Sequence, residues 1–326
     1  MNLMTWLRGV CALVLTCTMW SVSTTASAAW PEKPIRIVLG YAPGGASDLA
    51  ARVIAQHLQK KYGQAVTVDN RAGAGGRLGT DIVAKADPDG YTIALLVGAD
   101  AVVAAIDQKL PYNLLRDFAF VTTLTTYPFI LVAAPESKVK SLPQMIELAK
   151  KSPPGTIQYT TPGRGTTPHL AGELLNAMVG VSLTDVPYKG SSSALTDVMS
   201  ARVDFTIAAI PSVRGAIQQG KLKAIAVTSK DRAPAAPNVP AISEIIPGYD
   251  VTTWAGLAVP AKTPPAIVEK LSRDVGEIMK IKEVNDRFVE IGFYPATSTG
   301  AEMRARVESD IAKWKQLVQA RKLTFE

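Results

Sequence analysis

Two short stretches combine a proline–glycine turn with polar residues that could bind a small anion. The first is YAPGGASD, from Tyr41 to Asp48, and the second is TPGRGTTPH, from Thr161 to His169. Neither carries the Gly-Lys-Ser/Thr sequence of a phosphate-binding loop. Glycines let the backbone approach a ligand closely, and a helix N-terminus presents unpaired N–H groups with a partial positive charge. Such a turn can therefore bind a carboxylate without a cationic side chain.

A third turn, PYKGSSSAL, places Ser191, Ser192 and Ser193 at another predicted helix start. In the second turn, Thr167 is the predicted N-cap and Pro168 the first helical residue. Any one of these turns is also explained as a simple helix cap. Three similar turns favour the hypothesis that they converge on one small anion.

Asp48 and His169 are the side chains in these turns that could do further chemistry. A carboxylate in a first helical turn is stabilised by the helix dipole, but Asp48 could also contact an ammonium or hydroxyl group of a ligand. His169 could support its turn by a hydrogen bond, contact the ligand, or act as a general base beside a nucleophile. The sequence contains no G-x-S-x-G nucleophile motif, and the other histidine, His57, lies in a different predicted helix. We therefore expect no catalytic residue and no metal site.

The stretch GAGGRLG, from Gly73 to Gly79, comes close to the dinucleotide-binding fingerprint. Its last glycine is one place late, and no clear acidic partner follows at the right distance. We therefore expect no nucleotide and no other cofactor.

Strand and helix signals alternate along the chain in two successive sets, which indicates parallel sheets covered by helices. In the first set, a strand precedes a helix over residues 48–61, and in the second a strand precedes the helix that starts with TPH. Between the sets, residues 110–137 show a less regular pattern. The final helix carries Met303, Val307 and Trp314 on one face.

The N-terminus resembles a secretory signal peptide over residues 1–28, with one cation, an apolar run and a small-residue cleavage site near Ala28. Both cysteines, Cys11 and Cys17, would leave with it, unless Cys17 is lipidated. The formal net charge of the 326-residue chain is +7 without a Lys/Arg cluster, which argues against nucleic-acid binding.

The stretches YAPGGASDLAAR, VDNRAGAGGRLGT, DPDGYTI, YTTPGRGTTPHLAGELL, VPYKGSSSALTDVMSARVD and NVPAISEIIPGYDVTTWAGLAVPAKTPP resemble the Bug family. These proteins are periplasmic solute receptors of tripartite tricarboxylate transporters. The resemblance covers essentially the whole chain after residue 28. It implies an α/β fold of the type II periplasmic binding protein class, with two α/β lobes joined by a two-strand hinge and a ligand cleft between them. The first lobe would comprise residues 29–127 and 251–326, and the second residues 128–250.

Family members grip a carboxylate with backbone groups and ordered waters of the turns after the first strands of each lobe. On this chain, the candidate ligand-binding residues are Tyr41, Pro43, Gly44, Gly45, Ala46, Asp48, Gly163, Arg164, Gly165, Thr166, Thr167, His169, Ser191, Ser192 and Ala208. Two of them depart from the family pattern. Arg164 replaces a small residue and could donate to a second carboxylate or be a solvated loop arginine. Ala208 replaces an acidic or polar residue, which would suit an anionic or aromatic ligand.

The sequence thus predicts a monomeric, non-enzymatic periplasmic receptor for a small organic carboxylate, a di- or tricarboxylate or an aromatic acid, that delivers it to membrane transporter subunits. Two alternatives stay open. The protein could be a periplasmic sensor that feeds a membrane kinase, or an exported hydrolase that uses His169.

Overall fold

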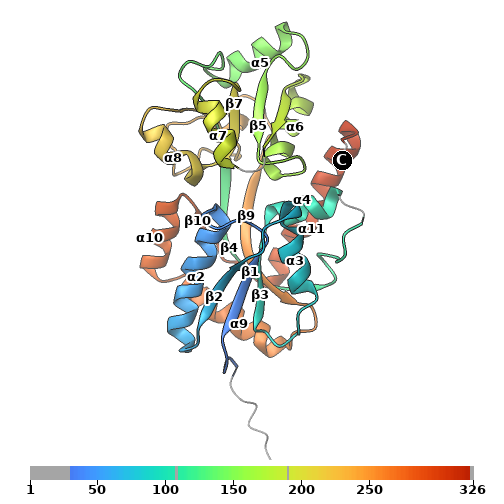
Figure 1. Cartoon of the computed structure of the whole chain (residues 1–326), viewed down its shortest axis with the longest axis vertical. Coiled ribbons are helices and arrows are strands. Elements are labelled where there is room, and N and C mark those ends of the chain that lie inside the picture. The colour runs from blue at the N-terminus through green and yellow to red at the C-terminus, as the bar shows by residue number, and fades with distance from the viewer. Residues whose placement is uncertain (1–29, 107–108, 189–190, 324–326) are drawn as a thin grey trace, which may run out of the picture. The chain divides into compact units, whose positions relative to one another are not determined.

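A computed structural model describes the chain outside four short ranges. The described residues are 30–106, 109–188 and 191–323. The predicted signal peptide, its cleavage site and the question of Cys17 lipidation lie outside them. Across the described residues, no helix has both the length and the apolar character needed to cross a membrane. From Lys33 onward, the described residues form one compact unit, in which two α/β lobes are connected by long strands (Figure 1).

The first lobe is built on a parallel β–α–β–α–β unit. Its elements are β1 (Ile35–Leu39), α2 (Ala46–Tyr62), β2 (Val66–Asn70), η1 (Ala74–Gly76), α3 (Arg77–Ala84), β3 (Thr92–Val97) and α4 (Gly98–Ile106). β1 lies between β2 and β3 and is parallel to both. The predicted helix over residues 48–61 is confirmed, and it begins two residues earlier and extends one residue further. It ends where Gly63 takes the left-handed conformation that closes many helices.

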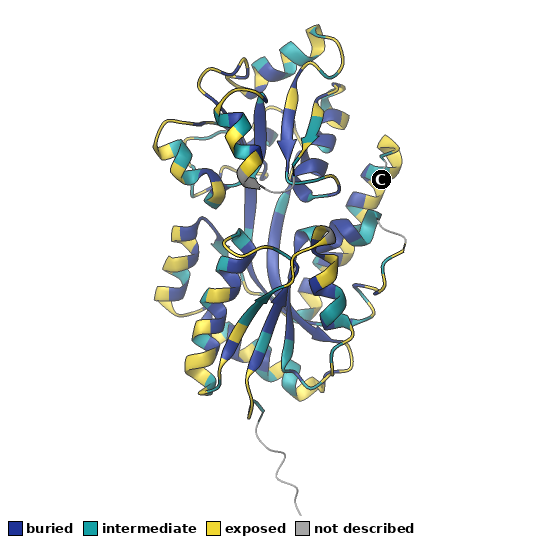
Figure 2. Cartoon of the chain, viewed as in Figure 1, coloured by how far each residue is buried: buried dark blue, intermediate teal, exposed yellow. Residues whose placement is uncertain are grey.

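The second lobe repeats the same order of elements. It contains α5 (Leu142–Lys151), β5 (Gln158–Thr161), α6 (Thr167–Val179), β6 (Thr184–Pro187), α7 (Ser191–Met199), β7 (Phe205–Ala209), α8 (Ile210–Gln218), β8 (Lys223–Val227) and η2 (Ile242–Glu244). β5 lies between β6 and β7 and is parallel to both. In both lobes the central strands are buried and the outer faces of the helices are exposed (Figure 2).

Two antiparallel strands connect the lobes: β4 (Phe118–Ala133) and β9 (Thr252–Pro260). β4 pairs with β9 as far as Pro128, and from Phe129 it pairs with β7 and β8 instead. The sequence pattern of residues 110–137 is less regular than that of the flanking sets, yet β4 within it is a single strand of 16 residues. It is buried along almost its whole length, and a strand covered on both faces lacks the alternation that reveals a strand in a sequence.

Thr228 ties the two connecting strands together at the point where β4 changes partners. Its hydroxyl accepts a hydrogen bond from the Phe129 N–H at 2.8 Å and lies 2.6 Å from the Val251 carbonyl oxygen. Its backbone N–H donates to the Phe129 carbonyl at 2.9 Å, and its carbonyl accepts from the Val251 N–H at 2.8 Å. Thr228 is fully buried, so these bonds satisfy backbone groups that water cannot reach.

The C-terminal part contains α9 (Pro265–Ile278), α10 (Lys282–Ile291), β10 (Tyr294–Pro295) and α11 (Gly300–Arg321). Helix α11 packs on both lobes. Met303 and Val307 belong to an apolar cluster with first-lobe residues such as Leu96, whereas Trp314 and Leu317 belong to one with second-lobe residues of β5 and β7.

The glycine-rich stretch that resembles a dinucleotide fingerprint has a packing role. A Cβ atom on Gly40, which follows β1, would lie 2.1 Å from the Gly76 carbonyl oxygen. A Cβ atom on Gly79 would lie 2.7 Å from the backbone nitrogen of Gly40. The glycines therefore let α3 and the loop before it pack directly on the chain that leads from β1 into the first turn.

We predict that Gly79→Ala destabilises the protein by about 1–3 kcal/mol, because the added methyl group meets backbone that cannot move aside. The control is Gly276→Ala in α9, where the methyl group would have open space. That substitution should stabilise by about 0.5–1 kcal/mol through helix propensity. Urea denaturation measures both. Equal changes for the two variants would contradict the close packing.

Candidate functional site

The topology of each lobe indicates where a ligand would bind. In the first lobe the chain leaves β1, forms β2 on one side of it and then β3 on the other. In the second lobe β5, β6 and β7 repeat this order. Ligands of open α/β sheets bind at the carboxyl ends of the strands where the chain reverses its direction of travel. The turns after β1, β3, β5 and β7 are therefore the candidate site. They include two of the three turns singled out in the sequence, and the third follows β6.

The turn after β1 is held by Asp48. Its Oδ2 atom accepts hydrogen bonds from the Gly44 N–H at 2.9 Å and from the Arg52 Nε at 2.8 Å, and its Oδ1 atom accepts from the Asn70 Nδ2 at 3.1 Å. Asp48 is buried. Burial raises the pKa of Asp48, but the hydrogen bonds outweigh this effect and hold that pKa below its usual value. Asp48 is thus an ionised clamp within the protein, which accounts for its charge without a ligand.

The other candidates in this turn differ in exposure. Pro43 and Gly44 are exposed, whereas Tyr41, Gly45 and Ala46 are half-buried. Gly44 has a φ of +80°, a conformation that favours glycine. α2 begins after Gly45 without a side-chain cap, so the first N–H groups of this helix have no capping side chain.

Tyr41 connects the turn to the glycine-rich loop. Its hydroxyl donates to the Gly75 carbonyl at 3.3 Å, and its own carbonyl accepts from the Asn70 Nδ2 at 3.0 Å. Burial raises the pKa of Tyr41 well above its usual value. The loop around Gly75 and Gly76 therefore borders the candidate site, although the sequence pattern does not assign it there.

The turn after β3 contains a buried acid that the sequence analysis does not identify. Asp100 accepts hydrogen bonds from the Val97 N–H and from the Thr80 hydroxyl, both at 2.8 Å. Burial raises the pKa of Asp100 to about 6, although the hydrogen bonds oppose the rise. Through Thr80 this carboxyl group fixes α3 relative to the end of β3. A GADA stretch after an apolar run is a weak signal, and only the topology shows its importance.

The turn after β5 corrects one prediction. Helix α6 begins at Thr167, so the N-cap is Thr166 and not Thr167, and Pro168 is the second helical residue. The Thr166 hydroxyl makes no capping bond and donates to the Gly163 carbonyl at 2.7 Å. Gly163 and Gly165 have φ values of +136° and +75°, so the turn places both in conformations that favour glycine.

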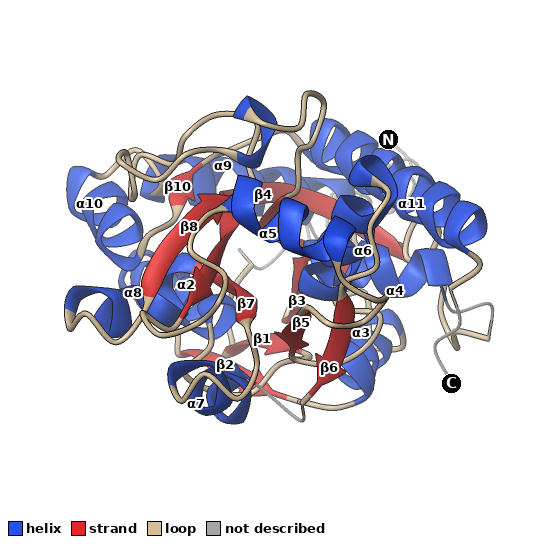
Figure 3. Ribbon diagram, turned by 90° about the horizontal axis from the view of Figure 1, so that it is seen from above, coloured by secondary structure: helices blue, strands red, loops and turns tan. Residues whose placement is uncertain are grey.

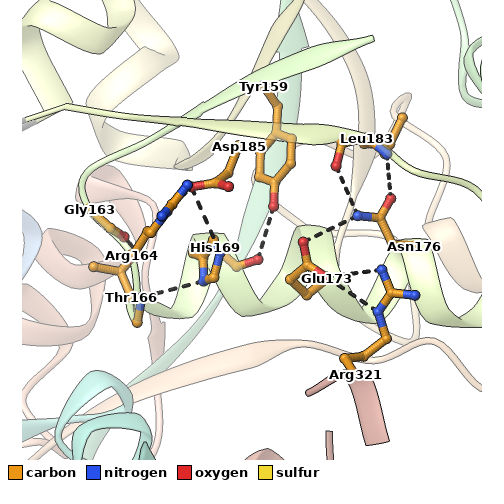
Figure 4. A network of polar contacts seen from close by, with 11 residues as sticks. Tyr159, Gly163, Arg164, Thr166, His169, Glu173, Asn176, Leu183, Asp185 and Arg321 are labelled. Atoms are coloured by element: carbon orange, nitrogen blue, oxygen red, sulfur yellow. Dashed lines mark hydrogen bonds and ion pairs between the residues drawn. The ribbon is translucent and has the colours of Figure 1, made fainter. Parts of the chain in front are cut away.

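His169 supports this turn from inside (Figure 4). Its Nδ1 atom accepts a hydrogen bond from the Gly165 N–H at 3.3 Å, and its Nε2 atom lies 3.9 Å from the Asp185 carboxylate. The Tyr159 hydroxyl donates to the His169 carbonyl at 3.2 Å. Burial lowers the pKa of His169. A buried neutral imidazole with Nδ1 engaged by the backbone matches the interpretation of His169 as a support of the turn.

Arg164 turns toward its own lobe. Its Nε atom lies 3.1 Å from the Asp185 carboxylate, while its side chain is 51% exposed (Figure 4). Arg164 is therefore not a simple solvated surface arginine. In this conformation Asp185 occupies its Nε donor, so only part of the guanidinium could bind a ligand. A role for Arg164 in binding a second carboxylate stays a prediction.

Three buried hydroxyl groups in this stretch have no hydrogen-bond partner among the described residues. Thr160 lies within β5, Thr161 ends that strand, and Thr167 begins α6. A buried hydroxyl usually finds a partner. The Thr161 and Thr167 hydroxyls therefore keep hydrogen-bonding capacity that the described protein groups do not use.

The remaining candidates give less information. Ser191 and Ser192 begin α7, but their side chains lie outside what the structure describes. Ala208 lies in β7, half-buried, and pairs with Ile130 of β4. Within the described residues, no group of three or more His, Cys, Asp or Glu side chains could hold a metal ion.

Two α/β lobes on a shared pair of strands, each with a strand-order reversal, define a class of two-lobe ligand-binding proteins. Residues 50–323 match the family described as the tripartite tricarboxylate transporter family receptor. The chain belongs to this family, and the resemblance to the Bug proteins is confirmed.

Two relatives align over nearly their whole lengths. The UPF0065 protein in the tcbD-tcbE intergenic region of Pseudomonas sp. (strain P51) is 35% identical over 95% of this chain and 93% of its own. Protein BugT of Bordetella pertussis is 34% identical over 89% of this chain and 90% of its own.

Three solved structures share the fold. R. palustris Rpa4515 with adipate has a TM-score of 0.83 at 32% identity, covering 90% of this chain and 98% of its own. The periplasmic binding protein BugD has a TM-score of 0.81 at 29% identity, covering 90% and 99%. MatC (Rpa3494) from Rhodopseudomonas palustris with bound malate has a TM-score of 0.79 at 29% identity, covering 89% and 100%. The fold is therefore that of a type II periplasmic binding protein.

We predict that Asp48→Asn destabilises the protein by about 1–3 kcal/mol at pH 7, because the amide replaces one of the two acceptor oxygens on which donors converge. The folded pKa of Asp48 lies below its unfolded value. The stabilisation from the carboxylate is therefore present above about pH 4 and is lost as the pH falls through the folded pKa. Urea denaturation should show a smaller difference in unfolding free energy between Asp48→Asn and the parent at pH 3 than at pH 7. Asp286→Asn, which removes an exposed pair with Lys282, should change stability by less than about 0.5 kcal/mol.

A second prediction concerns the pH dependence at His169, which faces Asp185, Glu173 and Arg164. Its folded pKa is lowered, so the contribution of the neutral ring is complete above about pH 6.5 and is lost as the pH falls through the folded pKa. Between pH 8 and pH 5 the parent should lose about 0.5–1.5 kcal/mol more stability than His169→Gln, because protonated Nδ1 cannot accept the Gly165 N–H. His57→Gln is the control for loss of an imidazole. Parallel stability curves for all three proteins would refute the role of Nδ1.

Proposed function

We propose that this protein is a periplasmic solute receptor that captures a small organic carboxylate, a di- or tricarboxylate or an aromatic acid, between its lobes and delivers it to the membrane subunits of a tripartite tricarboxylate transporter. The observation that carries the proposal is the turn after β5. There the N-terminus of a 13-residue helix adjoins the buried hydroxyls of Thr161 and Thr167, which have no partner among the described residues. Helix N-terminal N–H groups and hydroxyl donors together suit a carboxylate. The adipate and malate in two structural relatives support the same class of ligand.

The proposed lobes follow the change of partners along β4. We propose residues 29–127 with 251–326 as the first lobe and 128–250 as the second, with a hinge at Pro128 and Val251. Closure about such a hinge would bring the turns after β1 and β3 toward those after β5, β6 and β7. The ligand set would comprise the residues predicted from the sequence, together with Thr161.

We further propose that the protein acts as a monomer and is not an enzyme. The position of His169 supports the absence of enzymatic activity. A general base needs a free proton acceptor within reach of a nucleophile, and Nδ1 of His169 already accepts a backbone N–H. A thermal-shift screen with mono-, di- and tricarboxylates and aromatic acids tests the proposal. A stabilising compound should be recovered unchanged after prolonged incubation. If the compound is converted catalytically, or if no carboxylate binds, the proposal fails.

We predict that Thr167→Val weakens carboxylate binding about tenfold, the equivalent of one hydrogen bond. It should change the unfolding free energy little, because the hydroxyl bonds to none of the residues that the structure describes. Thr263→Val is the matched control, since Thr263 also has a buried hydroxyl without a partner among the described residues, but lies after β9. Isothermal titration calorimetry measures the affinities. Equal affinities for the two variants would exclude the Thr167 hydroxyl from the ligand set.

A further inference from the structure

The chain after α10 reaches across from the first lobe to the second. A Cβ atom on Gly292 would lie 3.5 Å from the Pro211 side chain and 3.6 Å from that of Ile210, both at the start of α8. Two residues later, Tyr294 packs against the second-lobe cluster that includes Ile130 and Val213. β10 is also paired to β4 just before the proposed hinge. Residues 290–295 thus form a non-covalent bridge between the lobes, beside the two connecting strands.

One polar contact of this bridge joins the lobes through α8. The Arg214 guanidinium of α8 donates to the Glu290 carbonyl oxygen, which belongs to the last turn of α10. Carbonyls at a helix C-terminus lack intrahelical partners and carry partial negative charge, so a guanidinium is a favourable partner for them. This bond joins the lobes directly, and any movement that separates α8 from the end of α10 must break it.

The opposite side of the molecule is joined differently. α8 and α10 lie on one side of β4, and α4 and α11 lie on the other, in both Figure 1 and Figure 3. On the α11 side, Trp314 and Leu317 are buried in the second-lobe cluster, and Arg321 forms an ion pair with Glu173 of α6 at 3.3 Å. Separating the lobes there would expose large apolar side chains. On the Arg214 side, the apolar contacts come from Gly292 and the half-buried Tyr294. Separating α8 from the end of α10 therefore breaks the hydrogen bond and exposes less apolar surface, so this is the side that can open and close.

We propose that Arg214 and the Glu290 carbonyl form an interlobe latch that stabilises the conformation in which the lobes are close together. The inference rests on the proposed function for its effect on binding, but not for its effect on the lobes. A ligand held between the lobes must wait for them to separate before it leaves. The latch therefore sets how long the ligand stays bound without contacting it, by shifting the balance between closed and open conformations.

Arg214→Met tests the latch, because it keeps the apolar part of the side chain and removes the donor. Arg287→Met is the matched control: Arg287 pairs with the Glu290 side chain within α10 and makes no contact with the second lobe among the interactions of the described residues. The probe of conformation is the distance between spin labels at Lys60→Cys and Lys150→Cys, one in each lobe. Pulsed electron paramagnetic resonance measures it on the chain without residues 1–28, which has no other cysteine.

In the absence of ligand, Arg214→Met should shift the distance distribution toward a more open population, and Arg287→Met should match the parent. A carboxylate found in the screen should dissociate from Arg214→Met about three- to tenfold faster than from the parent, as expected for loss of one hydrogen bond. Arg214→Lys retains a donor and should fall between the two, which keeps the test valid if Arg214→Met folds poorly. Distance distributions that coincide for Arg214→Met and the parent would overturn the latch. Because the distance measurement needs no ligand, failure of every carboxylate to bind would refute the proposed function and leave this test intact.

Discussion

The architecture depends on the hydrogen bonds of one buried residue, Thr228. β4 must belong to two sheets, and where it passes from β9 to β7 and β8 its backbone would lose partners. Pro128 has no N–H to offer at this point, and the Phe129 N–H bonds to the Thr228 hydroxyl instead of to a strand. Thr228 also bonds the backbone of Val251, where the chain returns to the first lobe. The Thr228 side chain thus provides hydrogen-bond partners for the backbone of both connecting segments where β4 changes partners. Unpaired backbone groups would be costly at this buried point.

The two lobes stabilise the turns after β1 and β5 in the same way. In each, a side chain in the first turn of the helix accepts the N–H of a glycine four residues earlier. Asp48 accepts from Gly44, and His169 accepts from Gly165. The glycine conformations are thereby fixed by protein groups before any ligand arrives. A pre-formed turn spares a ligand the entropic cost of ordering the loop, so weak backbone donors can suffice for binding.

The parts of this arrangement that could be predicted from the sequence are those encoded locally. The proline–glycine turns, the repeated strand–helix order and the two-lobe fold follow from short patterns and from the family's motifs. The length of β4 could not be predicted, because a strand buried on both faces has no alternation. The partner of Arg164 could not either, since Asp185 lies on a neighbouring strand. The place of Asp100 in the candidate site could not be predicted either, because it follows from the order of the strands in the sheet. The start of α6 was misplaced by one residue because Thr166 and Thr167 are equally good caps by composition.

Asp48 and His169, the side chains that hold the two turns, differ in charge. This difference bears on how a carboxylate would bind under the proposed function. α2 has an ionised aspartate in its first turn, balanced by Arg52, which offsets part of the positive potential of that helix N-terminus. α6 has no acidic residue in its first turn, and its clamp is a neutral imidazole. A carboxylate would therefore gain more at the second-lobe turn, where the Thr161 and Thr167 hydroxyls have no partner in the described part of the chain. The first-lobe turn, with its exposed glycine backbone, would then close over the rest of the ligand. Affinity divided in this way between a fixed anion site and a closing lobe permits release when the lobes separate, because no strong ion pair has to be broken.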